Sequence, residues 1–162
     1  MRRPDPPTGA LLDASGLRFA IVYSRFNLAI TEKLRDGASA ALRHANAAAA
    51  DIEVYDVPGA FEVPQAARAL AETGRIDAVV CLGCVIRGAT AHFEYISASV
   101  AHAIQQAAGD TGVPMAFGVL TTNTAEEALA RAGDDAGNKG REAALAGLEM
   151  ARLFERVPGP QA

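Results

Sequence analysis

The sequence predicts an α/β fold, a three-layer sandwich in which a four-stranded, mainly parallel sheet carries helices on both faces. Two observations lead to this prediction. Short apolar, strand-like segments alternate along the chain with helix-like segments of ten or more residues, and connections of that length give right-handed crossovers between parallel strands. The 162 residues, half of them hydrophobic, also suit one domain with a sizeable core.

The first half of the chain predicts two strands and two helices. An apolar run at 17–23 is typical of a buried strand, and Asn27 offers an N-cap for the helix that follows. A second strand is expected at 52–57, where Pro58 and Gly59 end it. The next helix tolerates Pro64 in its first turn. Apolar residues at helical spacing mark the two helices: Ile30, Leu34, Ala38, Ala41 and Leu42 in the first, and Val63, Ala66, Ala67 and Leu70 in the second.

The second half repeats the pattern. The most hydrophobic strand candidate, 77–86, is expected at the centre of the sheet, followed by a long helix over about 90–108 and a fourth strand at 115–120. Thr124 begins a capping-box pattern that opens a short helix. The last helix is expected at 141–154. The long helix has its apolar stripe at Phe93, Ile96, Val100, Ile104 and Ala107.

The domain organisation predicted is one domain over 17–156, preceded by a flexible arm at 1–16 that is rich in proline and followed by a tail at 157–162. Fifteen basic and nineteen acidic residues give a net charge of −4, which argues against a general nucleic-acid binder. The apolar runs are too short for a membrane span, and the beginning of the chain lacks a signal-peptide core. Two cysteines make no disulfide framework, so the expected compartment is the cytoplasm.

Residues suited to ligand binding follow each predicted strand. They lie in the loops 24–27, 58–62, 86–92 and 121–124, which should meet at one edge of the sheet because ligands of open parallel sheets bind beyond the carboxyl ends of the strands. The loop 86–92 runs through glycine straight into a helix, whose free N–H groups favour phosphate. His92 lies in the first turn and suits proton transfer. The alternative is a simple turn and a surface histidine.

Aromatic and charged residues near these loops admit two interpretations. Phe26 and Phe61 follow strands, where an exposed ring could stack on a flat heteroaromatic ligand, and Glu62 could accept hydrogen bonds from it. Alternatively, both rings pack under loops and Glu62 complements a helix dipole. Arg131 and Lys139 flank a glycine-rich loop that is either an anion clamp, serving an adjacent subunit, or a solvated loop.

Cys81 and Cys84 match the C-x-x-C pattern. A redox cysteine of this kind opens a helix, which lowers its pKa, whereas these two lie in a predicted strand at positions that face opposite sides of the sheet. Neither a second cysteine pair nor clustered histidines complete a zinc site. Both are therefore predicted to be buried small residues, with no metal bound.

Six segments, taken in order and at their spacing, resemble the 6,7-dimethyl-8-ribityllumazine synthase family over residues 16–154. The resemblance implies a flavodoxin-like fold and a condensation of 5-amino-6-(D-ribitylamino)uracil with 3,4-dihydroxy-2-butanone 4-phosphate. The reaction releases phosphate and water, uses no cofactor, and is the penultimate step of riboflavin biosynthesis. The segments that carry the resemblance are 24–27, 57–62, 83–92, 117–118, 131–133 and 137–140.

The resemblance also implies a role for individual residues. His92 would transfer protons, Phe26 would stack on the pyrimidine ring, and Arg131 would pair with the phosphate. The remaining substrate-binding residues would hold the ribityl chain and ring edge (Ala60, Phe61, Glu62), contact the pyrimidine through backbone (Cys84, Val85, Ile86), bind phosphate at the helix start (Ala89, Thr90), and complete the site from another subunit (Phe117, Lys139).

The family further implies a homo-oligomer, a pentamer or a 60-subunit shell of pentamers, with the active site between subunits. Two other functions remain open from the residues. A catalytically weak paralogue could keep the fold and act as a flavin or lumazine carrier or storage protein. A generic phosphate-binding module would explain the loop at 86–92 and leave Phe26, Phe61 and Glu62 unexplained.

Overall fold

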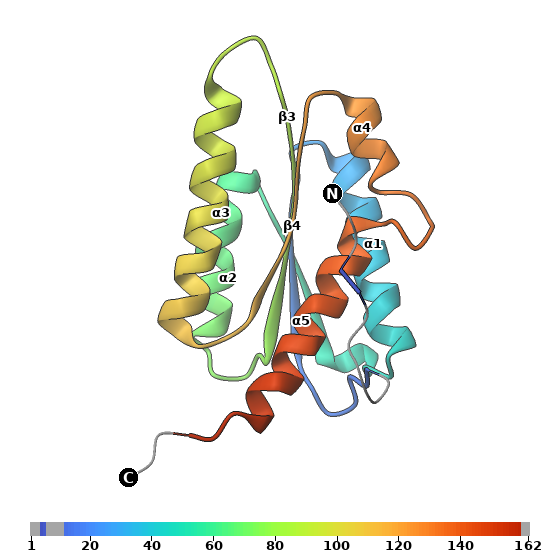
Figure 1. The fold of residues 1–162 in the computed structure, drawn as a ribbon, viewed down its shortest axis with the longest axis vertical. Helices are drawn as coiled ribbons and strands as arrows, with labels where there is room; N and C mark the ends of the chain where they lie inside the picture. The colour runs from blue at the N-terminus through green and yellow to red at the C-terminus, as the bar shows by residue number, and fades with distance from the viewer. Residues whose placement is uncertain (1–3, 6–11, 160–162) are drawn as a thin grey trace.

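The computed structural model describes residues 4–5 and 12–159 and contains one four-stranded sheet in the order β2-β1-β3-β4, with every neighbouring pair parallel. The predicted α/β fold is confirmed (Figure 1). The most hydrophobic strand, β3, pairs with strands on both sides, as expected. The strands are β1 (Phe19–Ser24), β2 (Ile52–Val57), β3 (Ala78–Ile86) and β4 (Met115–Thr122).

Helices cover both faces of the sheet, as Figure 1 shows from the β4 edge. One face carries α2 (Val63–Ala71) and α3 (His92–Thr111), and the other carries α1 (Leu28–His44), the short α4 (Ala125–Ala130) and α5 (Lys139–Arg156). Short 3₁₀ turns, Ala49–Asp51 and Ala60–Glu62, precede β2 and α2. The sandwich therefore has the three predicted layers.

The α1/α5 face holds the larger part of the core. All five apolar positions predicted for α1 are buried there, against alternate residues of the central strands. The two helices approach closely at Gly37 and Gly140, where an added Cβ would collide with Asn138 and with the carbonyl oxygen of Leu34. The α5 helix begins two residues earlier than predicted because the Asn138 side chain caps it, accepting a hydrogen bond from Arg141 N at 3.0 Å.

The α2/α3 face holds a smaller cluster of buried residues. Val100, Ile104 and Ala107 of the predicted α3 stripe are buried, whereas Phe93 and Ile96 in its first turns are half-buried. The burial of α3 thus decreases toward the end of the sheet where the ligand-binding loops were expected.

Most of the predicted arm at 1–16 lies outside the described residues. Its last residues pack on the domain, since Ala14 is fully buried and donates its N–H to the oxygen of Ala45 at 2.7 Å. The guanidinium of Arg152 on α5 donates to the carbonyl oxygens of Asp13 at 2.8 Å and Ser15 at 2.7 Å. The described residues just before β1 therefore contact the end of α1 and the α5 helix.

Candidate active site

The first two ligand-side loops are joined by their backbones. The N–H groups of Arg25 and Phe26 donate to the oxygens of Val57 at 2.8 Å and Pro58 at 3.1 Å. The Arg25 guanidinium also pairs with Asp56 at 2.6 Å, and this hydrogen bond holds the pKa of the Asp56 carboxyl below its usual value. The loops that follow β1 and β2 thus form one connected surface.

Asn27 links this surface to β3. Asn27 occupies the N-cap position of α1, as predicted, but its backbone is left-handed (φ 59°) and its side chain makes no hydrogen bond to the helix. The Nδ2 group instead donates to the carbonyl oxygen of Cys84 at 3.0 Å. Asparagine is among the few side chains that tolerate this backbone region, which is the one signal the sequence held for this role.

The 3₁₀ turn Ala60–Glu62 is seated directly on β3 at Gly83. A Cβ at Gly83 would lie 3.3 Å from the Ala60 Cβ and 3.3 Å from Ser24 Oγ, so the missing side chain lets these segments come together. Ala60 is buried, and the half-buried Glu62 carboxylate lies close to Gly59, where a Cβ would be 3.1 Å from Oε2. The turn thereby presents the ring of Phe61 outward.

Both phenylalanine rings of these loops face solvent, which agrees with the first of the two interpretations left open by the sequence. The exposed fraction is 72% for Phe26 and 58% for Phe61. Large apolar side chains at that exposure offer flat surfaces for stacking.

The end of β3 extends past the residues that pair with its neighbour β1. The β1–β3 pairing ends at Tyr23 and Leu82, whereas β3 continues with β4 as far as the pair Ile86 and Thr122. The last residues of β3, 84–86, therefore have no ladder partner in β1, and the oxygen of Cys84 is bonded to Asn27. We call this place, where β3 continues past the end of its pairing with β1, the step in the sheet. Backbone groups of β3 lie there beside the two phenylalanine loops.

The third loop leads from β3 to the start of α3 at His92, two residues later than the sequence predicted. Ala89, Thr90 and His92 are exposed, and the N-cap residue Ala91 has no capping side chain. The amide of His92 makes one long hydrogen bond, 3.4 Å, to Thr90 Oγ1. An uncapped helix start of this kind presents N–H groups and a positive dipole end to an anion.

Arg131 and Lys139 lie on the side of the sheet opposite α3. Arg131 follows α4, is exposed, and donates to the carbonyl oxygen of Glu127 at 2.9 Å. The backbones of Arg131 and Lys139 are joined at 2.9 Å, and Lys139 Nζ pairs with Glu142 at 2.7 Å. Both belong to the face covered by α1 and α5, away from α3 (Figure 1).

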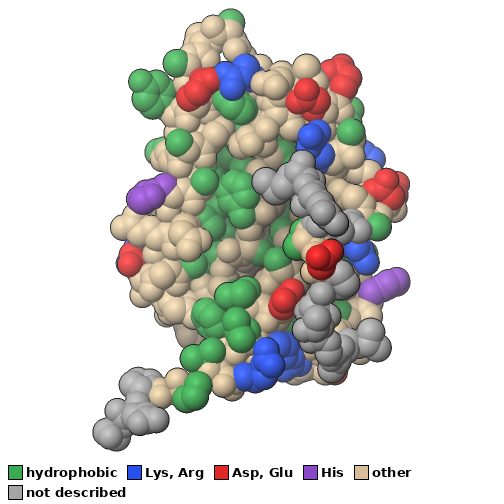
Figure 2. Space-filling model, in the orientation of Figure 1, with side chains coloured by type: hydrophobic (Ala, Val, Ile, Leu, Met, Phe, Trp, Pro, Cys, Tyr) green, Lys and Arg blue, Asp and Glu red, His purple; other side chains and the backbone are tan. Residues whose placement is uncertain are grey.

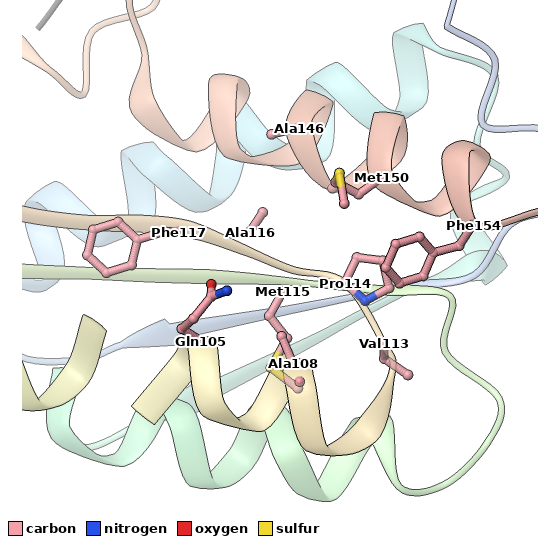
Figure 3. Close-up of a pocket in the computed structure, with 12 residues that line it drawn as sticks. Gln105, Ala108, Val113, Pro114, Met115, Ala116, Phe117, Ala146, Met150 and Phe154 are labelled. Atoms are coloured by element: carbon pink, nitrogen blue, oxygen red, sulfur yellow. The ribbon is translucent and has the colours of Figure 1, made fainter. Parts of the chain in front are cut away.

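Phe117 also stands apart from the phenylalanine loops. It pairs with Cys81, three positions before the partner of Cys84, which is about 10 Å down the strand. Its ring, 49% exposed, lies at one end of a groove along β4 with Phe154 at the other end (Figure 3). The groove has a volume of about 410 Å³, and hydrophobic side chains gather along it between α3 and α5 (Figure 2). It is lined by Gln105, Ala108, Gly109, Val113, Pro114, Met115, Ala116, Phe117, Ala146, Gly147, Met150 and Phe154.

The two cysteines are buried on opposite faces of β3, as predicted, and are unpaired thiols. Burial raises the pKa of Cys81 to about 12 and that of Cys84 to about 11, so neither is a reactive thiolate at neutral pH. Within residues 4–5 and 12–159, no three His, Cys, Asp or Glu side chains gather as a metal site would need. Over the same ranges, no helix has the length and apolar character to cross a membrane.

Comparison with known proteins identifies the family. The sequence profile of 6,7-dimethyl-8-ribityllumazine synthase matches residues 16–155. The chain is also 54% identical, over 150 residues, to a protein named 6,7-dimethyl-8-ribityllumazine synthase from Syntrophus aciditrophicus (strain SB). That match covers 93% of this chain and 97% of the relative. The phenylalanine loops, the helix start at His92 and these matches lead to one conclusion: the chain belongs to the 6,7-dimethyl-8-ribityllumazine synthase family.

Proposed function

We propose that the loops beyond the carboxyl ends of the strands are the substrate site for lumazine synthase activity, the enzyme activity in riboflavin biosynthesis that comes with membership of this family. In that reaction, ribitylaminouracil and dihydroxybutanone phosphate condense with loss of phosphate and water. The observation that carries the assignment to this end of the sheet is the step beside β1, where two exposed phenylalanine rings lie beside strand backbone that has no ladder partner in β1.

The pyrimidine substrate binds at this step. The ring of Phe26 stacks on the heterocycle, and backbone groups of 84–86 recognise its polar edge in the manner of an added strand. Ala60, Phe61 and Glu62 hold the ribityl chain, whose hydroxyl groups are donors for a carboxylate. The support for this placement is that Gly83 and Asn27 hold both loops against β3.

The phosphate substrate binds at the start of α3. Ala89 and Thr90 contribute N–H groups and a hydroxyl, and the helix dipole stabilises the leaving phosphate. His92 carries protons between the reacting groups during Schiff-base formation, elimination and ring closure, for which histidine is the suited residue type near neutral pH. The exposure of this loop and the lack of a capping side chain support the assignment.

A neighbouring copy of the chain completes each site with Phe117, Arg131 and Lys139. Phe117 lies on β4, three positions before the partner of Cys84, and Arg131 and Lys139 lie on the α1/α5 side of the sheet, opposite α3. The apolar groove along β4 gives a second copy a surface to cover. The assembly is a homo-oligomer, either a pentamer or a 60-subunit shell of pentamers, working in the cytoplasm on small molecules without nucleic acid, membrane, metal or organic cofactor.

The test follows lumazine absorbance with both substrates and a protein-free control. The two substrates also condense without an enzyme. Binding them together in the right orientation therefore supplies much of the rate acceleration. We therefore expect His92→Ala to slow turnover by about a hundredfold or less, and Arg131→Ala to raise chiefly the KM for the phosphate substrate. A His92→Ala protein with no activity above background would contradict the view that binding and orientation supply much of the rate acceleration. Tight lumazine or riboflavin binding by the unaltered protein, without turnover above background, would instead support the carrier function.

A further inference from the structure

Arg87 lies just before residues 88–91, the proposed phosphate site, which we call the phosphate loop. Its side chain contacts three other residues. Its Nε donates to Asn123 Oδ1 at 2.9 Å, in the loop that follows β4. Its Nη1 hydrogen-bonds the carboxylate of Glu94, and its guanidinium lies over the ring of Phe93, 4.4 Å from the centroid. The backbone N–H of Arg87 adds a bond of 2.8 Å to the oxygen of Thr122. One side chain therefore joins the end of β3, the end of β4 and the first turn of α3.

These contacts lie on both sides of the phosphate loop. Arg87 precedes the loop, while Phe93 and Glu94 follow it, so the guanidinium spans the loop from one end to the other. The residues between are exposed, and the position of a Cβ on Gly88 has no neighbour within 4 Å. Because little packs on the loop itself, its shape depends on how its two ends are held.

We propose that Arg87 is a positioning residue that holds the loop 88–91 in the conformation that binds the phosphate substrate, a role that rests on the proposed function. The guanidinium acts on the substrate through this loop, because its Nε, its Nη1 and its face are all engaged by protein groups. Arginine suits the task since its planar fork can bond in two directions and stack at once.

Charge gives a second reason for the pairing. Glu94 lies in the first turn of α3, where an anion is to bind, and its carboxylate would repel a phosphate. The hydrogen bond from Arg87 lowers the pKa of Glu94, so the carboxylate is ionised and its charge is balanced by the guanidinium. Removing Arg87 thus frees the loop and leaves a negative charge beside it.

The test measures steady-state kinetics of Arg87→Ala, Asn123→Ala and the double variant. We expect each single change to raise the KM for dihydroxybutanone phosphate, by about fivefold for Arg87→Ala, the size of a few exposed contacts, and by less for Asn123→Ala. The KM for ribitylaminouracil and kcat should change by less than about twofold. The KM of the double variant should be no higher than that of Arg87→Ala alone, because both changes remove the same hydrogen bond between Arg87 and Asn123.

Arg68→Ala is the matched control. Arg68 is equally exposed, at 47% against 45% for Arg87, and likewise joins two segments, through Glu72 and Asp110. Its loss should leave both KM values unchanged. Arg87→Lys should not restore the KM, because an ammonium group keeps the charge and loses the planar fork.

Hydrogen exchange of the two hydrogen-bonded amides that flank the loop, at position 87 (to Thr122 O) and at Tyr95 (to Ala91 O), measured without substrate, provides a readout that does not need turnover. We expect faster exchange there in Arg87→Ala, and unchanged exchange in the β3 core. Unchanged exchange, or faster exchange with an unchanged KM, would overturn the proposal. So would a raised KM in Arg87→Ala with none in Asn123→Ala, which would make Arg87 a direct phosphate ligand. Failure of the proposed function would appear separately, as no turnover by the unaltered protein.

Discussion

The two faces of the sheet are packed in different ways. On one face, α1 and α5 approach so closely that neither Gly37 nor Gly140 has room for a side chain, and Asn138 fills the space between them. On the other face, α3 is buried only along Val100, Ile104 and Ala107, and its outer side is open. The contact between α1 and α5 is closed by the chain itself, whereas the start of α3 and the β4 groove, which runs between α3 and α5, are open to other molecules.

The largest effect that tests this contrast is expected from Gly140→Ala. Its Cβ would collide with the carbonyl oxygen of Leu34, which is fixed backbone of α1. Relief requires the two helices to separate, and we expect a loss of about 3 kcal/mol in the free energy of unfolding. Urea denaturation measures it. A loss below about 1 kcal/mol would show that the α1/α5 contact is looser than described.

The two buried thiols give a pH test, one on each face. The pKa of Cys81 in the folded protein is about 12 against an ordinary value of 9.0. Stability from this group is therefore complete below pH 9 and is lost as the pH rises toward 12, by about 1.4 kcal/mol per pH unit. The free energy of unfolding should fall between pH 9 and 10, and Cys81→Ala should reduce that fall by about 1 kcal/mol.

Thiol reagents distinguish the same two residues. The pKa of Cys84 is raised less, to about 11, and Cys84 lies nearer the open end of the sheet. We expect both thiols to be protected at pH 8 in the folded protein, with Cys84 modified first as the pH rises. Earlier modification of Cys81 would indicate that the α2/α3 face opens more easily than its burial implies.

The smallest effect is expected from Gly109→Ala on the open face. Gly109 is exposed in the last turns of α3, and a Cβ there has no neighbour within 4 Å. Alanine should stabilise the helix by about 0.5–1 kcal/mol. The same urea titration used for Gly140→Ala measures it, and the opposite signs of the two changes are the prediction. If the groove along β4 is covered by a second copy, the gain will depend on protein concentration.

Local pattern was sufficient for much of the fold. The strand at 52–57 was predicted to the residue, and the stripe of α1 is buried as its spacing indicated. Boundaries shifted where a side chain decides them, as Asn138 does for α5. The burial of both cysteines also followed from their positions in a strand, whereas for Phe26 and Phe61 the sequence left exposure and packing under loops both open.

The sequence by itself determined the α/β class, the central place of β3 and the family, because periodicity and ordered motifs are properties of neighbouring residues. Only the tertiary structure decided three contacts: the hydrogen bond from Asn27 to Cys84, the packing of Ala60 against Gly83, and the hydrogen bond from Arg87 to Asn123. Each joins segments 20 or more residues apart. Their contact depends on how strands are ordered and how far each extends, which no local pattern specifies.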